Sequence, residues 1–325
     1  GKEVFKNKTG GTAWAWGSNY VGQLGQNGPG SRSSPVQVVG GTGWTSIKTD
    51  NNSNSIGGVK NDGTLWSWGY NRWGQLGQNQ GGAPHSSSSP VQVPGTTWKH
   101  VSVAQLAVAV KTNGTLWAWG YNAEGQLGHN NRTNYSSPVQ VGSDTTWATN
   151  INSFGGNYQS SMAIKTDGTL WGWGTNFLGT LGLNQAHETR VSSPVQIGDQ
   201  TNWVSITTGH GAQAAVNTSG QLWVWGDNEE GNLGQNNLVK YSSPVQIPGT
   251  NWAHCNIGSG DKRFLATKTD GTLWTWGDGM QGQMGNSTAG NPSHYSSPIQ
   301  IPGTGWDTTR LGIANNDYVQ FALKS

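Results

Sequence analysis

One segment, copied along the chain, limits the possible folds more than any other feature. It is clearest at residues 113–130, which read Asn-Gly-Thr-Leu-Trp-Ala-Trp-Gly-Tyr-Asn-Ala-Glu-Gly-Gln-Leu-Gly-His-Asn. It returns at 62–79, 167–184, 219–236 and 270–286, with a degenerate first copy at 10–27. The second tryptophan of the Trp-x-Trp-Gly motif recurs at intervals of 52, 51, 54, 52 and 51 residues. A nearly fixed period that fills the sequence predicts an array of one supersecondary unit.

Each period predicts four short antiparallel strands. The first follows a lone tryptophan, and the second is an apolar, β-rich run. An Asp-Gly or Asn-Gly pair then forms a tight hairpin, because both residues tolerate positive φ. The third strand is Leu-Trp-x-Trp-Gly, whose period-two alternation places both tryptophans on one sheet face. The fourth is Ser-Pro-Val-Gln-Val, with proline expected at the strand start. No helical periodicity of useful length appears.

Six four-stranded repeats predict an all-β fold, a β-propeller with six four-stranded blades. The chain starts with strands three and four of a blade (residues 12–38) and stops at the end of a second strand (residues 321–324). The ring is therefore expected to close by pairing N-terminal and C-terminal strands in one blade, which removes two free edges. The expected organisation is an N-terminal arm, residues 1–9, and a single propeller domain of six repeats, residues 10–325.

The composition supports a tryptophan-based core and excludes several classes of protein. Hydrophobic residues make up only 32% of the chain, but 19 residues are Trp, and 18 of these fall in the repeat frame. The net charge is +2 and Lys and Arg are not clustered, which argues against nucleic-acid binding. A single cysteine excludes internal disulfides, and no apolar run is long enough to span a membrane. The uncharged polar composition suggests an extracellular or virion-surface location.

The repeat resembles that of a known family. Gly-Thr-Leu-Trp-x-Trp-Gly-x-Asn-x-x-Gly-Gln-Leu-Gly followed by Ser-Ser-Pro-Val-Gln-Val is similar to the regulator-of-chromosome-condensation repeat, and the similarity covers residues 10–325. The resemblance implies a β-propeller, usually with seven blades, so six repeats here imply a six-bladed ring or one completed from outside the chain. The namesake is a guanine-nucleotide exchange factor for a small GTPase; other members resemble enzyme inhibitors or modules of ligases, kinases and phage surface proteins.

Two departures from the family pattern argue against an exchange factor. The family's Gly-x-x-His after the first inner strand is missing from most copies, and no long blade insertion could serve as a wedge into a GTPase. The chain also offers no sign of catalysis. Its seven histidines are not paired at metal-ligand spacing, and no nucleophile elbow, phosphate loop or calcium loop occurs. We therefore expect no catalytic residues, no metal, no cofactor and no enzyme activity.

Variation among the six copies points to one face of the blades. The hairpin and the Pro-Gly-Thr-x-Trp link between blades hardly change, and both lie at the same end of an antiparallel blade. The loops at the other end vary: those between strands one and two (50–55, 153–159, 209–213, 259–263, 314–317) and those between strands three and four (80–87, 131–135, 185–191, 237–241, 287–295). A constant scaffold with one diversified face is typical of a binding surface, although unconstrained drift would give the same pattern.

Candidate contact residues come from that variable face. The two residues before Gly-Gln-Leu-Gly differ in every copy, and Trp73 has no place in the repeat frame. Trp73 is either a partner contact or a side chain folded onto its own blade. The candidate partner-binding residues are Tyr20, Arg72, Trp73, Phe177, Leu178, Tyr135, Tyr241 and Tyr295.

The sequence therefore predicts a non-catalytic structural or adhesive module on a virion or cell surface, which binds a protein or glycan partner through its variable face. Two alternatives stay open: a regulator of a small GTPase of the exchange-factor class, and a secreted enzyme inhibitor of the same fold.

Overall fold

The computed structural model describes residues 10–49, 54–82, 85–185, 189–258, 262–279, 284–285, 294–313 and 320–324. In this part of the chain, strands and turns dominate, and the one helical element is a short 3-10 turn, η1 (Phe177–Gly179). The chain divides into two compact units. Unit 1 comprises 1–49, 53–122 and 133–145, and unit 2 comprises 50–52, 123–132 and 146–325.

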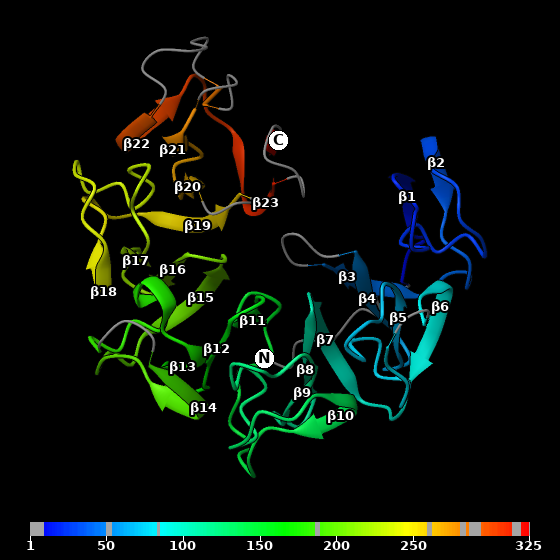
Figure 1. Cartoon of the computed structure of the whole chain (residues 1–325). Coiled ribbons are helices and arrows are strands. Elements are labelled where there is room, and N and C mark those ends of the chain that lie inside the picture. Colours follow the sequence, from blue (N-terminus) through cyan, green and yellow to red (C-terminus); the bar gives the residue numbers. More distant parts are fainter. Residues whose placement is uncertain are drawn as a thin grey trace, which may run out of the picture. The chain divides into compact units, whose positions relative to one another are not determined.

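The strands of unit 1 form one two-stranded and two four-stranded antiparallel sheets, each a simple meander (Figure 1). The two-stranded sheet contains β1 (Trp14–Gly17) and β2 (Arg32–Gln37). The first four-stranded sheet contains β3 (Trp44–Lys48), β4 (Ser55–Lys60), β5 (Leu65–Gly69) and β6 (Ser87–Val93). The second contains β7 (Trp98–Val103), β8 (Leu106–Lys111), β9 (Leu116–Gly120) and β10 (Tyr135–Gln140).

Unit 2 contains three four-stranded sheets and one two-stranded sheet. The first four-stranded sheet contains β11 (Phe154–Gly156), β12 (Ser160–Ile164), β13 (Leu170–Thr175) and β14 (Arg190–Gln196), and the second contains β15 (Trp203–Thr208), β16 (Ala212–Asn217), β17 (Leu222–Gly226) and β18 (Tyr241–Gln246). The third contains β19 (Trp252–Ile257), β20 (Arg263–Lys268), β21 (Leu273–Asp278) and β22 (His294–Ile301). The two-stranded sheet contains β23 (Trp306–Ile313) and β24 (Gln320–Lys324). Four strands per repeat, joined as consecutive hairpins, confirm the predicted blade. We call these sheets blades 2 to 6 in chain order, starting from β3–β6, and call β1–β2 blade 1.

The two-stranded sheets have the strand content that ring closure requires. β1 and β2 are strands three and four of a repeat, and β23 and β24 are strands one and two. Because the two sheets belong to different units, their pairing into one blade, and the single domain that it implies, stay predictions.

Proline lies inside the fourth strand, not at its start as the sequence analysis expected. In β6 the strand begins at Ser87, and Pro90 falls where the register with β5 shifts between the Ser67–Val91 and Gly69–Ser87 pairs. The fourth strand is the outermost of its sheet. At an irregular position on an outer strand no backbone N–H is required for pairing, so proline, which has none, is tolerated there.

Blade 4 departs from the expected strand order. The sequence predicts a strand directly after Trp147 and a loop at 153–159, but Trp147 forms only an isolated bridge with Lys165, and β11 lies inside the predicted loop. Ile164 explains the difference: its carbonyl accepts from Ala148 N at 2.9 Å, and its own N–H donates to the Ser153 carbonyl at 2.8 Å. The residues between these two partners bulge out of the ladder, and pairing resumes beyond them.

Tryptophans join each blade to the one before it. The second Trp of the motif is at most 1% exposed in blades 2 to 6. Its indole N–H donates to a backbone carbonyl in the Gly-Gln-Leu-Gly segment of the preceding blade, or its equivalent. The pairs are Trp68–Gln23, Trp119–Gln75, Trp173–Gln126, Trp225–Thr180 and Trp276–Asn232, all at 2.9–3.0 Å. Within a blade, Trp98 contacts both motif tryptophans, Trp117 at 5.9 Å and Trp119 at 6.0 Å, which confirms their common face.

Glycine is required where blades approach most closely. Gly74 has φ +81°, and a Cβ on it would lie 2.6 Å from the Ser136 Cβ and 2.7 Å from the Ser136 Cα in the next blade. Gly82 has a similar φ of +95°, but a Cβ there would meet nothing within 4 Å. The two residues therefore separate the cost of backbone strain from the cost of blade packing.

We expect Gly82→Ala to lower the free energy of unfolding by about 1 kcal/mol, because alanine is strained at positive φ. Gly74→Ala should cost about 3 kcal/mol, because a backbone atom of the next blade must also move. Urea denaturation of both variants, followed by intrinsic fluorescence, measures the difference. Equal losses in the two variants would show that close blade contact does not constrain Gly74.

Candidate interaction surface

The loop after the third strand has a fixed conformation set by two buried amide side chains. In blade 2, Asn71 accepts a hydrogen bond from Leu76 N at 2.9 Å and donates to the Gln80 carbonyl at 3.0 Å. Gln75 accepts from the N–H of Trp73 at 2.9 Å. Asn71 is 3% exposed and Gln75 is 1% exposed. Because loop backbone groups are bonded to rigid side chains, residues 72 and 73 are held in one orientation.

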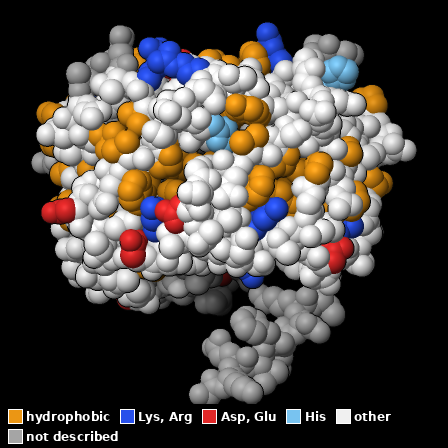
Figure 2. Space-filling model, turned by 90° about the horizontal axis from the view of Figure 1, so that it is seen from below, with side chains coloured by type: hydrophobic (Ala, Val, Ile, Leu, Met, Phe, Trp, Pro, Cys, Tyr) orange, Lys and Arg blue, Asp and Glu red, His pale blue; other side chains and the backbone are white. Residues whose placement is uncertain are grey.

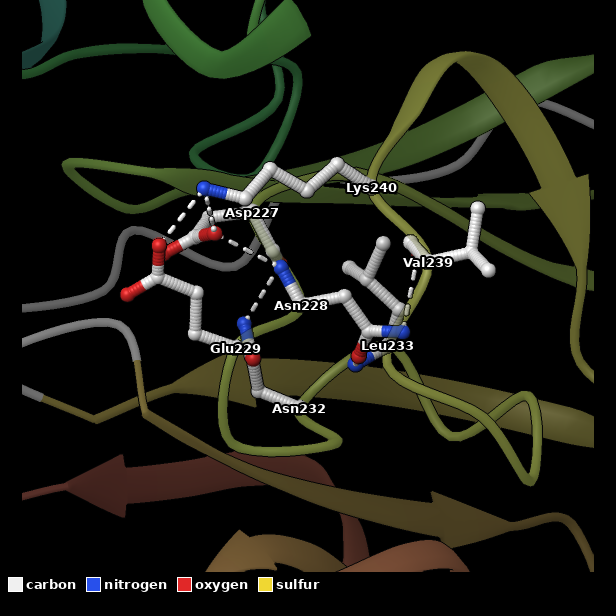
Figure 3. Close-up of polar contacts among 7 residues, drawn as sticks. All are labelled: Asp227, Asn228, Glu229, Asn232, Leu233, Val239 and Lys240. Atoms are coloured by element: carbon white, nitrogen blue, oxygen red, sulfur yellow. Dashed lines mark hydrogen bonds and ion pairs between the residues drawn. The ribbon is translucent and has the colours of Figure 1, made fainter.

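The same clamp recurs in other copies. The equivalent asparagines donate to carbonyls nine to eleven residues on, at 2.8–3.1 Å: Asn19 to Gly28, Asn122 to Thr133, Asn176 to Gln185 and Asn228 to Asn237. Figure 3 shows the blade 5 version, in which Asn228 accepts from Leu233 N at 2.8 Å and donates to the Val239 carbonyl at 2.9 Å. The Gly-x-Asn-x-x-Gly spacing of the repeat is therefore the signature of a clamped loop that carries two variable residues.

The first variable residue is exposed in blades 1, 2 and 5. Tyr20 is 86% exposed, Arg72 is exposed, and the Glu229 side chain is 68% exposed. Phe177, in the same position of blade 4, is half-buried. Glu229 binds the ammonium of Lys240 at 2.7 Å, and Lys240 also pairs with Asp227 at 3.1 Å (Figure 3).

The second variable residue bridges to the next blade. Trp73 packs on Tyr121 with ring centroids 4.7 Å apart, and the Arg72 guanidinium lies 4.9 Å from the Trp73 ring. Glu124 forms an ion pair with Arg190. Glu230 pairs with Lys262 at 3.4 Å and with His294 at 3.0 Å.

Trp73 therefore lies neither free in solvent nor on its own blade alone. It forms a cation–aromatic group, the Arg72–Trp73–Tyr121 stack, across two neighbouring loops of unit 1, in which Arg72 is exposed and the two aromatic side chains are half-buried. Sequence reasoning missed Tyr121, because that residue belongs to the repeat frame and gave no sign of a neighbour in the next copy.

The other predicted contact residues are more buried. Tyr135, Tyr241 and Tyr295 lie at or near the start of the fourth strand and are half-buried against core clusters. The Tyr241 hydroxyl accepts from the Asn237 side chain at 3.0 Å. Leu178 is half-buried in η1 with φ +59°. Each of these side chains has a packing role, and its contact with a partner stays a prediction.

Two further groups on the variable loops were not predicted. Leu238 and Val239 are 60% and 56% exposed in the loop before β18. Tyr158 and His210, from the loops between strands one and two of blades 4 and 5, stack with centroids 6.4 Å apart. All four residues lie within or directly beside loops already marked as variable, and that variation was the only signal in the sequence.

The described residues offer few groups for chemistry. No three His, Cys, Asp or Glu side chains among them are placed to hold a metal ion. Cys255 is buried, and burial raises the pKa of its thiol. Burial, together with the positive charges of Lys99 and Lys48, lowers the pKa of His100 to about 4. No helix in the described part of the chain has the length and apolar character to cross a membrane.

Charge is sparse on the molecular surface. On the face drawn in Figure 2, backbone and uncharged polar side chains together cover most of the surface, hydrophobic side chains gather in several places, and the few Lys, Arg, Asp and Glu side chains are mostly scattered. That face therefore presents no broad basic patch of the kind that nucleic-acid binding requires.

Comparison with known proteins confirms the resemblance seen in the repeats. A family model for the regulator of chromosome condensation (RCC1) repeat matches residues 62–108, 113–158, 167–216, 219–260 and 270–306. The ultraviolet-B receptor UVR8 of Arabidopsis thaliana is 26% identical over 295 residues, 88% of this chain and 65% of the receptor. The human E3 ubiquitin-protein ligase HERC2 is 28% identical over 310 residues, 90% of this chain but 6% of the ligase. The chain thus spans about two thirds of one curated relative and a small part of the other.

Solved structures support the fold. The structure of Prp20p from Saccharomyces cerevisiae, described with its binding properties to Gsp1p and histones, superposes with a TM-score of 0.76 at 19% identity and covers 96% of this chain and 77% of Prp20p. Human WBSCR16 superposes with a TM-score of 0.73 at 21% identity, and the match covers 90% of this chain and 77% of WBSCR16. At such identity the likeness shows the fold alone, and that fold is a β-propeller.

Protonation of His100 should destabilise unit 1 in acid. In the unfolded chain His100 takes up a proton near its ordinary pKa of 6.5, whereas in the folded protein it stays neutral down to about pH 4. The buried imidazole therefore does not lower the free energy of unfolding above pH 6.5, and it lowers it more and more as the pH falls toward 4. We expect His100→Gln to recover on the order of 2 kcal/mol at pH 4 and nothing at pH 7.5. Urea denaturation at both pH values checks this, and a pH-independent effect would contradict it.

Proposed function

Because this chain belongs to the regulator of chromosome condensation repeat family, we propose that it is a non-catalytic β-propeller that regulates a protein partner by binding it through the variable loops. The relatives named above include a receptor and a ubiquitin ligase, so their specific activities differ while the repeat is shared. A shared scaffold with different activities places function in the loops, not in the fold.

The clamped loop is the observation that carries this proposal. In blades 1, 2 and 3 the asparagine and the glutamine of the repeat both hold the loop backbone while the two central residues change. Blades 4 and 5 keep the asparagine bonds, but Thr180 and Asn232 replace the glutamine, and in blade 4 the backbone turns into η1 with Leu178 at positive φ. Preorganised side chains lose little entropy on binding, so such a loop suits recognition of a folded partner.

The Arg72–Trp73–Tyr121 stack is the strongest contact candidate. Tryptophan, tyrosine and arginine are the residue types most often found at binding hot spots. The Arg72 guanidinium and the Trp73 ring are already in contact in the free protein, so they offer a preformed surface of mixed cationic and aromatic character.

The location and the kind of partner remain part of the proposal. The uncharged polar composition is the support for an extracellular or virion-surface location and an adhesive role. The names of the relatives given above do not add to that support, and they favour a regulatory role. A protein is favoured over a glycan as the partner of this face, because charged side chains such as Arg72, Glu229 and Glu230 alternate with aromatic ones there.

Truncation of the first variable residue of three loops should abolish partner capture. We expect the variant Tyr20→Ala, Arg72→Ala, Phe177→Ala, immobilised and exposed to extract of the native source, to lose the partner that the wild-type protein retains. The matched control replaces Thr42, Thr96 and Thr250 with Ala, since these exposed threonines lie in the links at the opposite end of the blades. Equal capture by both variants, each folded by circular dichroism, would move the binding site away from the variable loops.

An exchange factor is the alternative in which the partner is a small GTPase. On our proposal, the protein should not accelerate release of fluorescent GDP from a panel of small GTPases. Acceleration that disappears in the Tyr20, Arg72 and Phe177 variant would replace our proposal with this alternative. If the captured partner is instead an enzyme that the protein inhibits, the inhibitor alternative is correct.

A further inference from the structure

A groove of about 290 Å³ lies between blades 5 and 6 of unit 2, and residues 234–236 on its blade 5 side directly precede the variable loop 237–241. Trp252 and Trp274 form its aromatic wall, and Pro248 and Pro298 flank it. The Lys268 ammonium enters the groove and lies 4.6 Å from the Trp252 ring centroid and 4.5 Å from that of Trp274. The volume is near the lower end of the range for small-ligand sites.

The Lys268 ammonium lacks a hydrogen-bond acceptor among the described residues. Its counterpart in blade 2, Lys60, donates to the Gly40 carbonyl at 2.7 Å. The Asp270 carboxylate accepts two bonds from Thr272 at its Oδ1 atom, from the backbone N–H and the hydroxyl, and the charge of Lys268 helps to lower its pKa, but no hydrogen bond joins it to the ammonium. An ammonium has three N–H donors. The indole faces attract its positive charge, but they do not serve as hydrogen-bond acceptors for these N–H groups. Lys268 can therefore bind an anionic oxygen.

The rim of the groove adds a polar donor. Asn236 is exposed, and its side-chain oxygen accepts from the Ser297 hydroxyl at 3.4 Å. The amide NH₂ of Asn236 is left as a donor beside the lysine. The groove thus combines flat apolar rings, one cation and one neutral donor.

We propose that this groove binds a hexuronate unit of an acidic polysaccharide. The sugar carboxylate would accept from Lys268, the apolar C–H face of the pyranose would lie on Trp274 and Pro298, and a hydroxyl would accept from Asn236. A ring with one apolar face and one charged edge fits this arrangement better than an acidic peptide side chain, which offers only one or two methylenes to the indoles. The residues of this site lie outside the variable loops, and the site does not depend on the function proposed for them.

The same arrangement occurs in unit 1. Each residue type that lines the groove recurs between blades 2 and 3, at Gly77, Gln78, Asn79, Pro94, Trp98, Lys111, Trp117, Ser137 and Pro138. Lys111 lies 4.6 Å from Trp98 and 4.4 Å from Trp117, and Ser137 donates to Asn79 at 3.3 Å. Each unit therefore carries one copy of the site.

The corresponding position between blades 4 and 5 provides a natural control. There Leu183, Gly198 and Asn217 replace the glutamine, proline and lysine of the groove. The Trp203–Trp223 pair keeps its geometry, with centroids 6.1 Å apart, but no ammonium lies over it. This position should not bind the acidic sugar.

Isothermal titration with oligogalacturonate tests the proposal on the full chain. We expect measurable binding that weakens with added salt, and no binding of the methyl-esterified oligomer, which has the same rings without the charge. The double variant Lys111→Met, Lys268→Met keeps the apolar stems over the indoles and should raise the dissociation constant at least about tenfold. Trp274→Phe should weaken binding, and the matched control Trp223→Phe should not.

Three results would overturn the assignment. They are the absence of binding to oligogalacturonate, equal binding of the esterified oligomer, and tighter binding of oligoglutamate that is lost in the same lysine variant. The last would identify an acidic-peptide site. Trp274→Phe also removes the indole hydrogen bond to Thr272, whereas the Trp223 N–H has no acceptor among the described residues, so the melting temperature of each variant is measured and binding is compared where both are folded.

Discussion

The hydrogen bond from an indole N–H to a backbone carbonyl of the preceding blade is the contact on which the rest of the structure depends. It occurs in blades 2 to 6, always from the second tryptophan of the motif. The carbonyl belongs to the loop after the third strand of the neighbour, so one interaction fixes both the packing of two sheets and the position of a loop. The buried N–H of the second motif tryptophan thus has a backbone partner, whereas the buried N–H groups of lone tryptophans such as Trp98, Trp203 and Trp252 have none among the described residues.

Fixing the loop through the backbone leaves its side chains free to vary. Gln75 shows how this works: its carbonyl accepts from Trp119 of the next blade, while its side chain accepts from the N–H of Trp73. Neither bond depends on which residues occupy positions 72 and 73. The scaffold can therefore carry Arg-Trp, Ala-Glu, Phe-Leu or Glu-Glu at the same place without a change of fold, which is why we assign recognition to these positions.

The sequence predicted what each repeat does within itself and failed where a contact depends on the next repeat. The hairpins, the four strands and the common face of the two motif tryptophans follow from local turn chemistry and period-two alternation. The Trp73–Tyr121 and Glu124–Arg190 contacts join residues of different copies, and no local pattern sets that register. The bulge before β11 arises from extra residues that the chain must place outside the ladder, and the position of an insertion is not readable from propensity.

Blade 5 shows which parts of the repeat the fold requires. Asn217 replaces the lysine and Gln221 the threonine found in blades 2, 3, 4 and 6; their side chains bond to each other at 2.8 Å, and Gln221 reaches Gln246 at 3.3 Å. The Trp223 indole N–H is buried without an acceptor among the described residues, yet the blade keeps four strands, and Trp203 is still only 3% exposed. A blade thus forms without an ammonium over its indoles. The ammonium groups of Lys111 and Lys268 are therefore not required for a blade to form, and the charge that they place over the indoles is available to a ligand.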